Sequence, residues 1–323
     1  MSVGSTVETE LTCTLYDREE FLGLFSEPVD IPVNARSMMK LSVLQVENGD
    51  FILDRFYNTI ADASLAYVLS RVDLAKVNSL PVQKMGSVFE DVKSRFQTAN
   101  GTNAEGGEIL LYALLEAVLS APKLLSKMEL KTSNQMPVFG ADGVHLLKVK
   151  DGAYQLIFGE AKMYGSLKDA LKSAFQSMDE IRGKAFRDDL SLVSTQILKE
   201  AVNQEQLDVL ESILLPSKED ASRVILTKSF GVLVGFDLDV SEIDISSLTD
   251  GEISAEYKRL ATEAVKAEIS YISSRIKHYR FGATPIHLFA VPFLKYDIAG
   301  KQRSIKDVRK EMQHRLSVGK RGE

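Results

Sequence analysis

The sequence of 323 residues contains a single cysteine, Cys13. One thiol excludes an internal disulfide, and it excludes every zinc site that needs several cysteines. The four histidines are scattered along the chain, and their spacing fits no known zinc site. A reducing compartment, the cytoplasm, is therefore the simplest expectation.

Long hydrophobic runs are also missing. The longest, FGVLVGF and HLFAVPFL, are far shorter than the ~20 residues that a membrane-spanning helix needs, so they predict buried strands. The first residues, MSVGSTVETELTC, show neither the basic region nor the apolar region of a secretory signal. We expect no membrane association.

Three common catalytic or nucleotide-binding signatures do not occur: the Walker A motif, the G-x-S-x-G elbow and the Rossmann glycine pattern. The Gly106-Gly107 pair predicts the entry of a helix rather than a nucleotide-binding loop. There is no internal repeat and no low-complexity tract. Function must therefore be sought in a different kind of site.

Charge is distributed unevenly along the chain. The net charge is −6, but residues 275–323 carry about +8 and the other residues about −14. Such a basic end is typical of a surface that faces a polyanion or a partner, and a merely solvated basic helix is the alternative. Arg275, Lys277 and Arg280 could contact phosphates there, with Tyr279 available for base stacking.

The hydrophobic periodicity predicts an α/β chain with a mixed central sheet flanked by helices. Residues 1–98 are expected to form a mostly helical N-terminal extension, and residues 99–323 the main domain, which ends in a basic helix. The helix that starts after Ser166 should be capped by this serine, with Asp169 at the third helical position. We expect helices at 52–73, 82–98, 108–120, 167–184, 188–201, 204–214, 252–276 and 302–316, and strands at 8–16, 124–132, 138–149, 153–162, 224–238 and 286–294.

Residues 139–166, FGADGVHLLKVKDGAYQLIFGEAKMYGS, predict a hairpin with charged residues at its open end. Glu160 and Lys162 are two positions apart on a strand, so their side chains leave the same face. Whether Asp142 joins them depends on the pairing register of the two strands.

The turn sets this register. A three-residue loop, Lys150-Asp151-Gly152, would place Val149 opposite Ala153 and Asp142 opposite Glu160. A two-residue loop with no bulge would turn Asp142 to the far face. We expect the first register, or an equivalent bulge, because only then do the three charges meet.

Two carboxylates and an ammonium are costly to bury unless they have a polar task or a compensating ion. A hard divalent cation is the natural occupant, since Mg²⁺ takes one or two carboxylates and completes its shell with water and phosphate. Such an ion activates water and neutralises a scissile phosphate, while Lys162 would orient the attacking water. The alternative is a salt bridge of Lys162 with Glu160 or Asp142 at a sheet edge.

These residues resemble the motif of the PD-(D/E)xK nuclease superfamily, with Asp142 from GADGVH and with Glu160 and Lys162 from GEAK. The resemblance implies a restriction-endonuclease-like core of helix, three strands, helix and strand. No proline directly precedes Asp142, which departs from the full motif. His145 should point away from Asp142 and be a buried hydrogen-bonding residue, and His287 should likewise be structural.

The superfamily also implies two helical residues near the metal. Glu108 in GGEILLYALLEAVL would be the carboxylate of the first core helix, with Glu105 and Glu116 as alternatives, although Glu116 is expected to be solvated. Gln176 would be the glutamine of the helix after the third strand. Its polar face also carries Lys168 and Lys172, so a merely solvated Gln176 is the alternative.

More narrowly, the segments GGEILLYALLE, GADGVHLL and FGEAKMYGSL resemble the HamA family, the nuclease subunits of Hachiman anti-phage systems. The resemblance covers about residues 100–300. It implies a superfamily 2 helicase, HamB, as the partner that restrains the nuclease until foreign or damaged DNA is engaged. Residues 1–98 lie outside the nuclease core and are the candidate contact for this partner.

The sequence therefore predicts a metal-dependent DNA endonuclease that uses Mg²⁺, or Mn²⁺ in its place. An inactive nuclease-fold adaptor that binds DNA or a helicase is the alternative, and RNA is an alternative substrate because a metal–phosphate site does not read the sugar. The expected metal ligands are Asp142, Glu160 and Glu108. The other expected catalytic residues are Lys162 and Gln176, and the expected nucleic-acid contacts are Lys168, Lys172, Arg275, Lys277 and Arg280.

Overall fold

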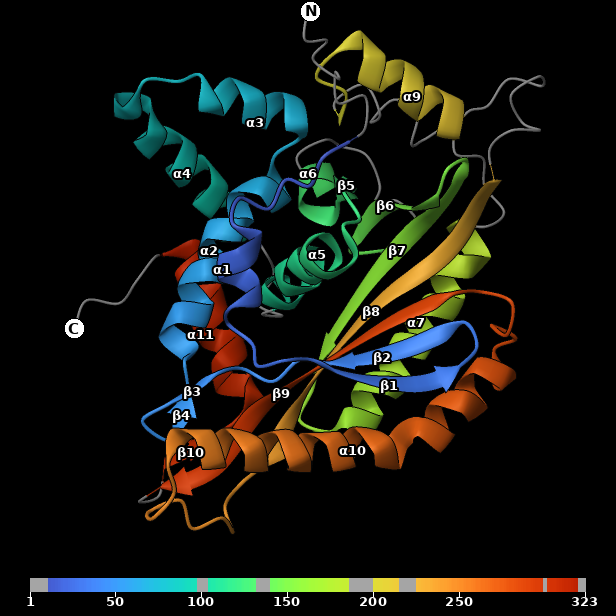
Figure 1. Ribbon diagram of the computed structural model, residues 1–323. Coiled ribbons are helices and arrows are strands. Elements are labelled where there is room, and N and C mark those ends of the chain that lie inside the picture. Colours follow the sequence, from blue (N-terminus) through green and yellow to red (C-terminus); the bar gives the residue numbers. More distant parts are fainter. Residues whose placement is uncertain are drawn as a thin grey trace, which may run out of the picture.

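The computed structural model describes residues 11–97, 104–131, 140–185, 200–214, 225–298 and 301–318 (Figure 1). Its centre is one mixed sheet with the strand order β1-β2-β9-β8-β7-β6-β5, and β10 pairs with β9 outside this path. The strands are β1 (Val29–Asn34), β2 (Ser37–Leu41), β5 (Lys123–Ser126), β6 (Gly143–Lys150), β7 (Ala153–Met163), β8 (Ile225–Asp239), β9 (Ile286–Ile298) and β10 (Lys301–Arg303). The predicted α/β class with a mixed central sheet is confirmed.

Strand direction divides the sheet into a parallel centre and antiparallel edges. The pairs β2–β9, β8–β9 and β7–β8 are parallel, whereas β1–β2, β6–β7 and β5–β6 are antiparallel. The middle parts of the central strands, residues 229–236 of β8 and 288–294 of β9, are continuously buried, as expected for strands covered on both faces. A separate two-stranded sheet consists of β3 (Val46–Glu47) and β4 (Asp50–Phe51).

Helices cover both faces of the central sheet (Figure 1). The helix α5 (Glu105–Leu119) packs on β6, β7 and β8, and α2 (Leu53–Val68) and α11 (Ile305–Ser317) pack against it. The helix α7 (Leu167–Ala185) packs on β7 and β8 from the other side, next to α10 (Asp250–His278). The remaining helices are α1 (Arg18–Leu22), α3 (Arg71–Asn78), α4 (Val82–Gln97), α6 (Lys127–Lys131) and α9 (Gln204–Leu214).

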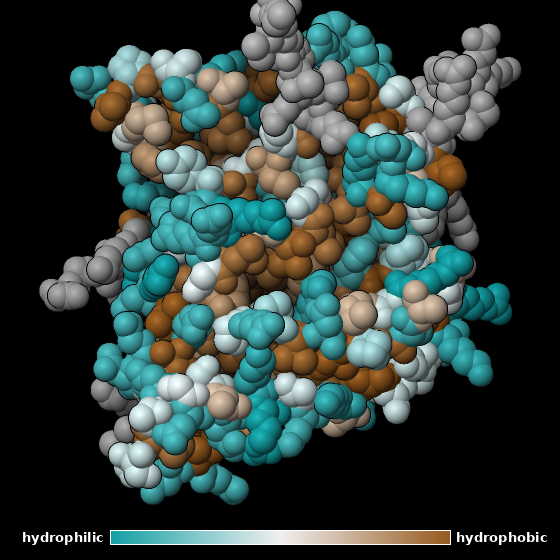
Figure 2. All heavy atoms as spheres, viewed as in Figure 1, coloured by the Kyte–Doolittle hydropathy of each residue, from teal (hydrophilic) through white to brown (hydrophobic). Residues whose placement is uncertain are grey.

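The surface reflects this layering. Figure 2 shows hydrophobic residues in a central band, where Figure 1 places α5 and the sheet, and hydrophilic residues around it. Within the described parts of the chain, no helix is long and apolar enough to cross a membrane.

Several predicted elements need correction. The described part of the predicted strand 8–16, residues 11–16, is not a strand. The predicted helix 52–73 is two helices, because Ser70 caps α3 by accepting a hydrogen bond from the Asp73 N–H. The predicted strand 124–132 ends at Ser126, where α6 begins. The predicted helix 188–201 lies largely outside the described residues.

The N-terminal part differs most from expectation. β1 and β2 extend the central sheet, because β2 pairs in parallel with β9. The strands show period-two burial, with Ser37, Met39 and Leu41 buried in β2. A boundary after residue 98 stays a prediction, although residues on both sides of it contribute to one sheet.

Candidate functional site

The hairpin of β6 and β7 has the register that the charge pattern required. Gly143 pairs with Gly159, and the same register continues to Lys148 opposite Tyr154. The turn itself differs from the prediction, since Lys150 pairs with Ala153 and the loop is only Asp151-Gly152. The register shifts between Lys148 and Lys150, so a bulge takes the place of the predicted three-residue loop.

This register places Asp142 beside Glu160, just before β6 begins. The Asp142 N–H donates a hydrogen bond to the Gly159 carbonyl at 2.9 Å. The Ala161 N–H donates to Asp142 Oδ2, also at 2.9 Å. The backbone groups of Gly159 and Ala161, on either side of Glu160, therefore hold Asp142 against β7.

Three carboxylates from three elements are buried in this region. Glu108 of α5, Asp142 before β6 and Glu160 of β7 are 4%, 7% and 3% exposed. Glu108 is in the first turn of α5, where two glycines let the helix approach its neighbours. A Cβ atom on Gly106 would lie 2.7 Å from Met312 of α11, and one on Gly107 would lie 3.0 Å from Met163 of β7.

Two lysines neutralise these carboxylates. Lys162 Nζ lies 2.6 Å from Glu160 Oε1. Lys127, at the start of α6, lies 2.7 Å from Glu108 Oε1 and 3.0 Å from Asp142 Oδ1. Burial opposes the charge of both lysines, but Asp142 and Glu108 raise the pKa of Lys127, and Glu160 raises the pKa of Lys162.

Burial and mutual repulsion shift the carboxyl groups in the direction of protonation. Burial, with the Asp142 charge as the next cause, raises the pKa of Glu108 to about 7, and Lys127 partly offsets it. The same two causes raise the pKa of Glu160 to about 7, against the effects of Lys162 and of a hydrogen bond with Ser177. Perturbed carboxyl groups of this kind are concentrated at functional sites.

Tyr67, Ser177 and Lys127 join the site although the sequence did not indicate them. Tyr67 of α2 donates a hydrogen bond to Glu108 Oε2 at 3.0 Å, and its hydroxyl is 3.2 Å from the Asp142 carbonyl. Ser177 of α7 contacts Glu160. No local pattern in the sequence marks Ser177 or Tyr67.

The other predicted site residues lie on α7, on α10 or just after α10. Gln176 is exposed on α7, and its neighbour Ser177 is the residue that contacts Glu160. Lys168 and Arg275 each lie over the Tyr271 ring, with their charged groups 5.3 Å from its centroid. Lys172, Lys277 and Arg280 are exposed.

Glu105 and Glu116 are both buried, so the expectation of a solvated Glu116 was wrong. Glu116 is 0% exposed and accepts hydrogen bonds from the N–H groups of Thr14, Leu15 and Lys123 at 2.6–2.8 Å. It therefore anchors the N-terminal segment to β5. Glu105 is 3% exposed, and its charge contributes to the raised pKa of Glu108.

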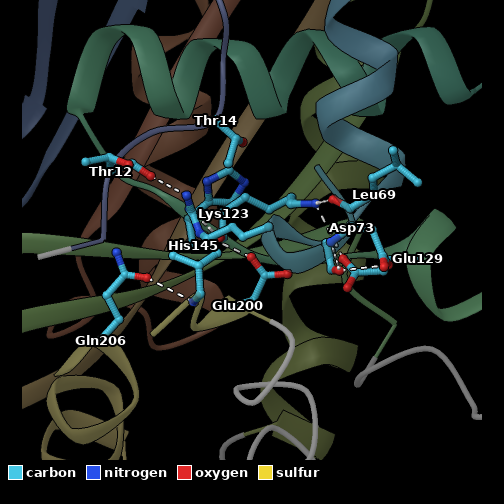
Figure 3. Close-up of polar contacts among 12 residues, drawn as sticks. Thr12, Thr14, Leu69, Asp73, Lys123, Glu129, His145, Glu200 and Gln206 are labelled. Carbon is cyan, nitrogen blue, oxygen red and sulfur yellow. Dashed lines mark hydrogen bonds and ion pairs between the residues drawn. The ribbon is translucent and has the colours of Figure 1, made fainter. Parts of the chain in front are cut away.

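A second group of buried charges lies around Lys123 (Figure 3). Lys123 Nζ donates to the Leu69 carbonyl at 2.7 Å and to the Tyr67 carbonyl at 3.3 Å, and it lies 3.4 Å from Glu129. Arg71 pairs with Glu200 at 3.2 Å and donates to the Lys123 carbonyl at 2.9 Å. The Tyr67 carbonyl accepts a hydrogen bond from Lys123, and the Tyr67 hydroxyl donates one to Glu108. The second cluster therefore helps to position Tyr67 against Glu108.

His145 and His287 have the structural roles expected of them. His145 is 2% exposed, and its Nδ1 lies 2.8 Å from the Ala121 carbonyl, so Nδ1 carries the proton. Burial lowers the pKa of His145 to about 3. His287 Nε2 lies 2.8 Å from Gln155 Oε1, and burial lowers its pKa as well.

The donor set suits a hard divalent cation by its chemistry, because all three acidic groups offer oxygen ligands. Within the ranges that the structure describes, no group of three or more Asp, Glu, His or Cys residues is arranged as a ready metal cage. Lys127 and Lys162 hold the carboxylate oxygens instead. Magnesium needs only one or two protein carboxylates, so Asp142 and Glu160 would suffice.

Comparison with known proteins gives one positive result. No curated protein matches the chain. The model of the HamA family matches residues 20–316, which includes β1, β2 and every residue of the carboxylate group. The chain therefore belongs to the HamA family.

Proposed function

We propose that this protein is a metal-dependent DNA endonuclease, the effector of an anti-phage complex in which a helicase restrains and activates it. Membership of the HamA family suggests a component of Hachiman defence. The observation that carries the nuclease proposal is the register of the hairpin, which aligns Asp142 with Glu160 and leaves Lys162 on the same side. This is the residue pattern of a PD-(D/E)xK site.

Asp142 and Glu160 would hold the ion, with Glu108 as a further ligand or as a hydrogen-bonding partner of its waters. A bound Mg²⁺ or Mn²⁺ would supply an activated water and would neutralise charge on the scissile phosphate. Lys162, at 2.6 Å from Glu160, would then orient the attacking water and stabilise developing negative charge. Tyr67 would keep Glu108 in place through its 3.0 Å hydrogen bond.

DNA would approach along α7 and the end of α10. β7 leads directly into α7, so Lys168 in the first turn follows soon after Lys162. Lys168 and Arg275 both lie against Tyr271, which combines positive charge with an aromatic ring. This combination supports contact with the DNA phosphates and stacking of a base.

The partner contact is proposed for the N-terminal part. The corner formed by α3 and the start of α4 projects in Figure 1, and α4 carries exposed apolar side chains. Val82 is 83% exposed and Phe89 is 46% exposed. Exposed apolar residues of this kind favour a protein contact.

A second candidate function is an inactive adaptor with the same fold. The observation that favours it is the pairing of Lys127 with Glu108 and Asp142, which occupies carboxylate oxygens that a metal would need. Both candidates predict binding of DNA or helicase, but only the first predicts cleavage.

A cleavage assay separates the two candidates. The chain, with and without its co-encoded helicase and ATP, would be incubated with plasmid, linear and single-stranded DNA and with RNA, in Mg²⁺ or EDTA. We expect Mg²⁺-dependent DNA cleavage that falls at least roughly a hundredfold in Glu160→Gln and in Lys162→Met. Glu180→Gln and Lys266→Met alter exposed residues and serve as matched controls. Equal cleavage by Glu160→Gln and wild type would refute the assignment.

A further inference from the structure

Lys127 occupies the space between two of the proposed ligand carboxylates. Its Nζ lies 2.7 Å from Glu108 Oε1 and 3.0 Å from Asp142 Oδ1. Its backbone N–H also donates a hydrogen bond to the Asp142 carbonyl at 3.0 Å. Lys127 thus contacts Asp142 twice, through a backbone hydrogen bond and through an ion pair of its ammonium group.

The two lysines of the site differ in their position. Lys162 pairs with Glu160, the carboxylate two residues before it on β7. Lys127 comes from α6, outside the hairpin, and bridges two carboxylates from separate elements. One positive charge between two negative charges removes part of their repulsion, so Lys127 does electrostatically what a bound cation would do.

An ammonium and a magnesium ion cannot share this position. Mg²⁺ binds oxygen at ~2.0–2.1 Å, whereas the lysine nitrogen already lies within 3.0 Å of both carboxylate oxygens. The side chain of Lys127 is 32% exposed, so its charged end can move into solvent without crossing the core. The side chains of Glu108 and Asp142 are only 3% and 10% exposed and would stay in place.

We infer that Lys127 is a built-in counter-cation, which holds Glu108 and Asp142 together in the metal-free protein and competes with the divalent ion for them. This inference rests on the proposed nuclease site. Lys127 is then a positioning residue rather than a catalytic one. Its competition keeps the affinity for the ion low until the lysine is drawn away, and the DNA phosphates that reach the site are the chemical group that could attract it.

The test measures binding of Mn²⁺ to full-length Lys127→Gln, Lys127→Arg and wild-type protein, by calorimetry and by the electron paramagnetic resonance of free Mn²⁺. Loss of the competing charge should make Lys127→Gln bind Mn²⁺ roughly tenfold tighter or more. Lys127→Arg keeps the charge and should bind no tighter than wild type. Lys148→Gln removes a surface lysine that pairs with Asp151 and is the matched control.

A second readout is the melting temperature. Without metal, Lys127→Gln should melt below wild type, because Glu108 and Asp142 then repel each other, and Mn²⁺ should raise its melting temperature more than that of wild type. If wild type binds Mn²⁺ and Lys127→Gln binds it no tighter, the counter-cation is refuted and the nuclease proposal stands. If Lys127→Arg binds Mn²⁺ more tightly than wild type, the counter-cation is also refuted, and this result does not depend on the folding of Lys127→Gln. If neither wild type nor any variant binds Mn²⁺, both proposals fail.

Discussion

Spacing along the chain explains which individual residues could be predicted. Asp142, Glu160 and Lys162 belong to one hairpin, so a local rule about register was enough to bring them together. Tyr67 and Lys127 reach the same carboxylates from α2 and α6, and their positions depend on how these helices pack. Local patterns carry no information about such long-range contacts.

Glu116 shows how an acidic residue of a buried helix can be mistaken for a solvated one. All residues of α5 from Glu105 to Ala117 are buried. A helix that is apolar on every side is covered on every side, so its few acidic residues must be buried and hydrogen-bonded. The apolar run ILLYALL carries this signal and indicates a buried Glu116.

His145 gives a prediction about acid stability. Its pKa is about 3 in the folded protein, below the ordinary value of about 6.5 expected in the unfolded chain. The unfolded chain therefore binds the proton more tightly, and the stability that neutral His145 contributes is complete above pH ~6.5 and is lost as the pH falls toward 3. Between pH 7 and pH 5 the wild type should lose about 2 kcal/mol of unfolding free energy relative to His145→Gln.

Urea denaturation of both proteins at the two pH values checks this expectation. His278→Gln, which alters an exposed residue at the end of α10, is the control and should follow the wild type. If the difference in unfolding free energy between wild type and His145→Gln is the same at pH 7 and at pH 5, His145 does not cause the acid sensitivity.

At the scale of elements, strong hydrophobic periodicity predicted the longer helices and strands correctly. β7, β8, β9, α7 and α10 lie within a few residues of their predicted bounds, and Ser166 caps α7 as expected, with the Asp169 N–H 3.2 Å from its hydroxyl. Short elements were missed or merged. β1 and β2 have only six and five residues, and β5 ends where α6 begins, so their signals fall below the window that periodicity needs.

The close contact of α5 with α11 gives a prediction at this scale. In Gly106→Ala the new Cβ would lie 2.7–2.8 Å from Met312 Cε and Cβ, so the helices must separate near Glu108. We expect a loss of about 1–3 kcal/mol in unfolding free energy. Shortening Met312 to alanine in the same protein removes the contact with Cε but leaves the contact with Cβ at 2.8 Å, so it should not restore the wild-type stability.

Gly86→Ala is the matched control, since Gly86 lies in α4 and, among the described residues, nothing outside the nearby backbone of α4 lies within 4 Å of the position that a Cβ atom would take there. It should gain up to about 1 kcal/mol, because alanine favours the helix. Equal stability of the two variants in urea denaturation would show that the α5–α11 contact does not require glycine.

For the whole molecule, ion pairs reduce the charge asymmetry of the sequence. Arg303 lies 2.8 Å from Asp50, and Arg315 lies 2.7 Å from Asp54. The basic C-terminal segment is thus partly neutralised by acidic residues of the N-terminal part. The positive charge proposed to meet DNA comes from α7 and from the first residues of this segment, at the end of α10.

Lys168 provides the prediction for this surface. Lys168→Ala should weaken DNA binding by a similar factor for all sequences, and it should reduce the slope of log affinity against log salt by about one. Lys266→Ala, which alters an exposed lysine of α10, is the control. Fluorescence anisotropy in EDTA over a range of salt concentrations measures both effects, and an unchanged slope in Lys168→Ala would exclude a phosphate contact there.

The central claim is that Asp142 and Glu160 form one cation site at the open end of the hairpin. The most direct measurement is the anomalous scattering of Mn²⁺ in crystals of the protein, alone or in complex with DNA and the helicase. We predict an anomalous peak within coordination distance of the carboxylates of Asp142 and Glu160, and no peak there in Glu160→Gln. Active, Mn²⁺-loaded protein with no peak at these carboxylates, or with its only peak elsewhere, would contradict this claim.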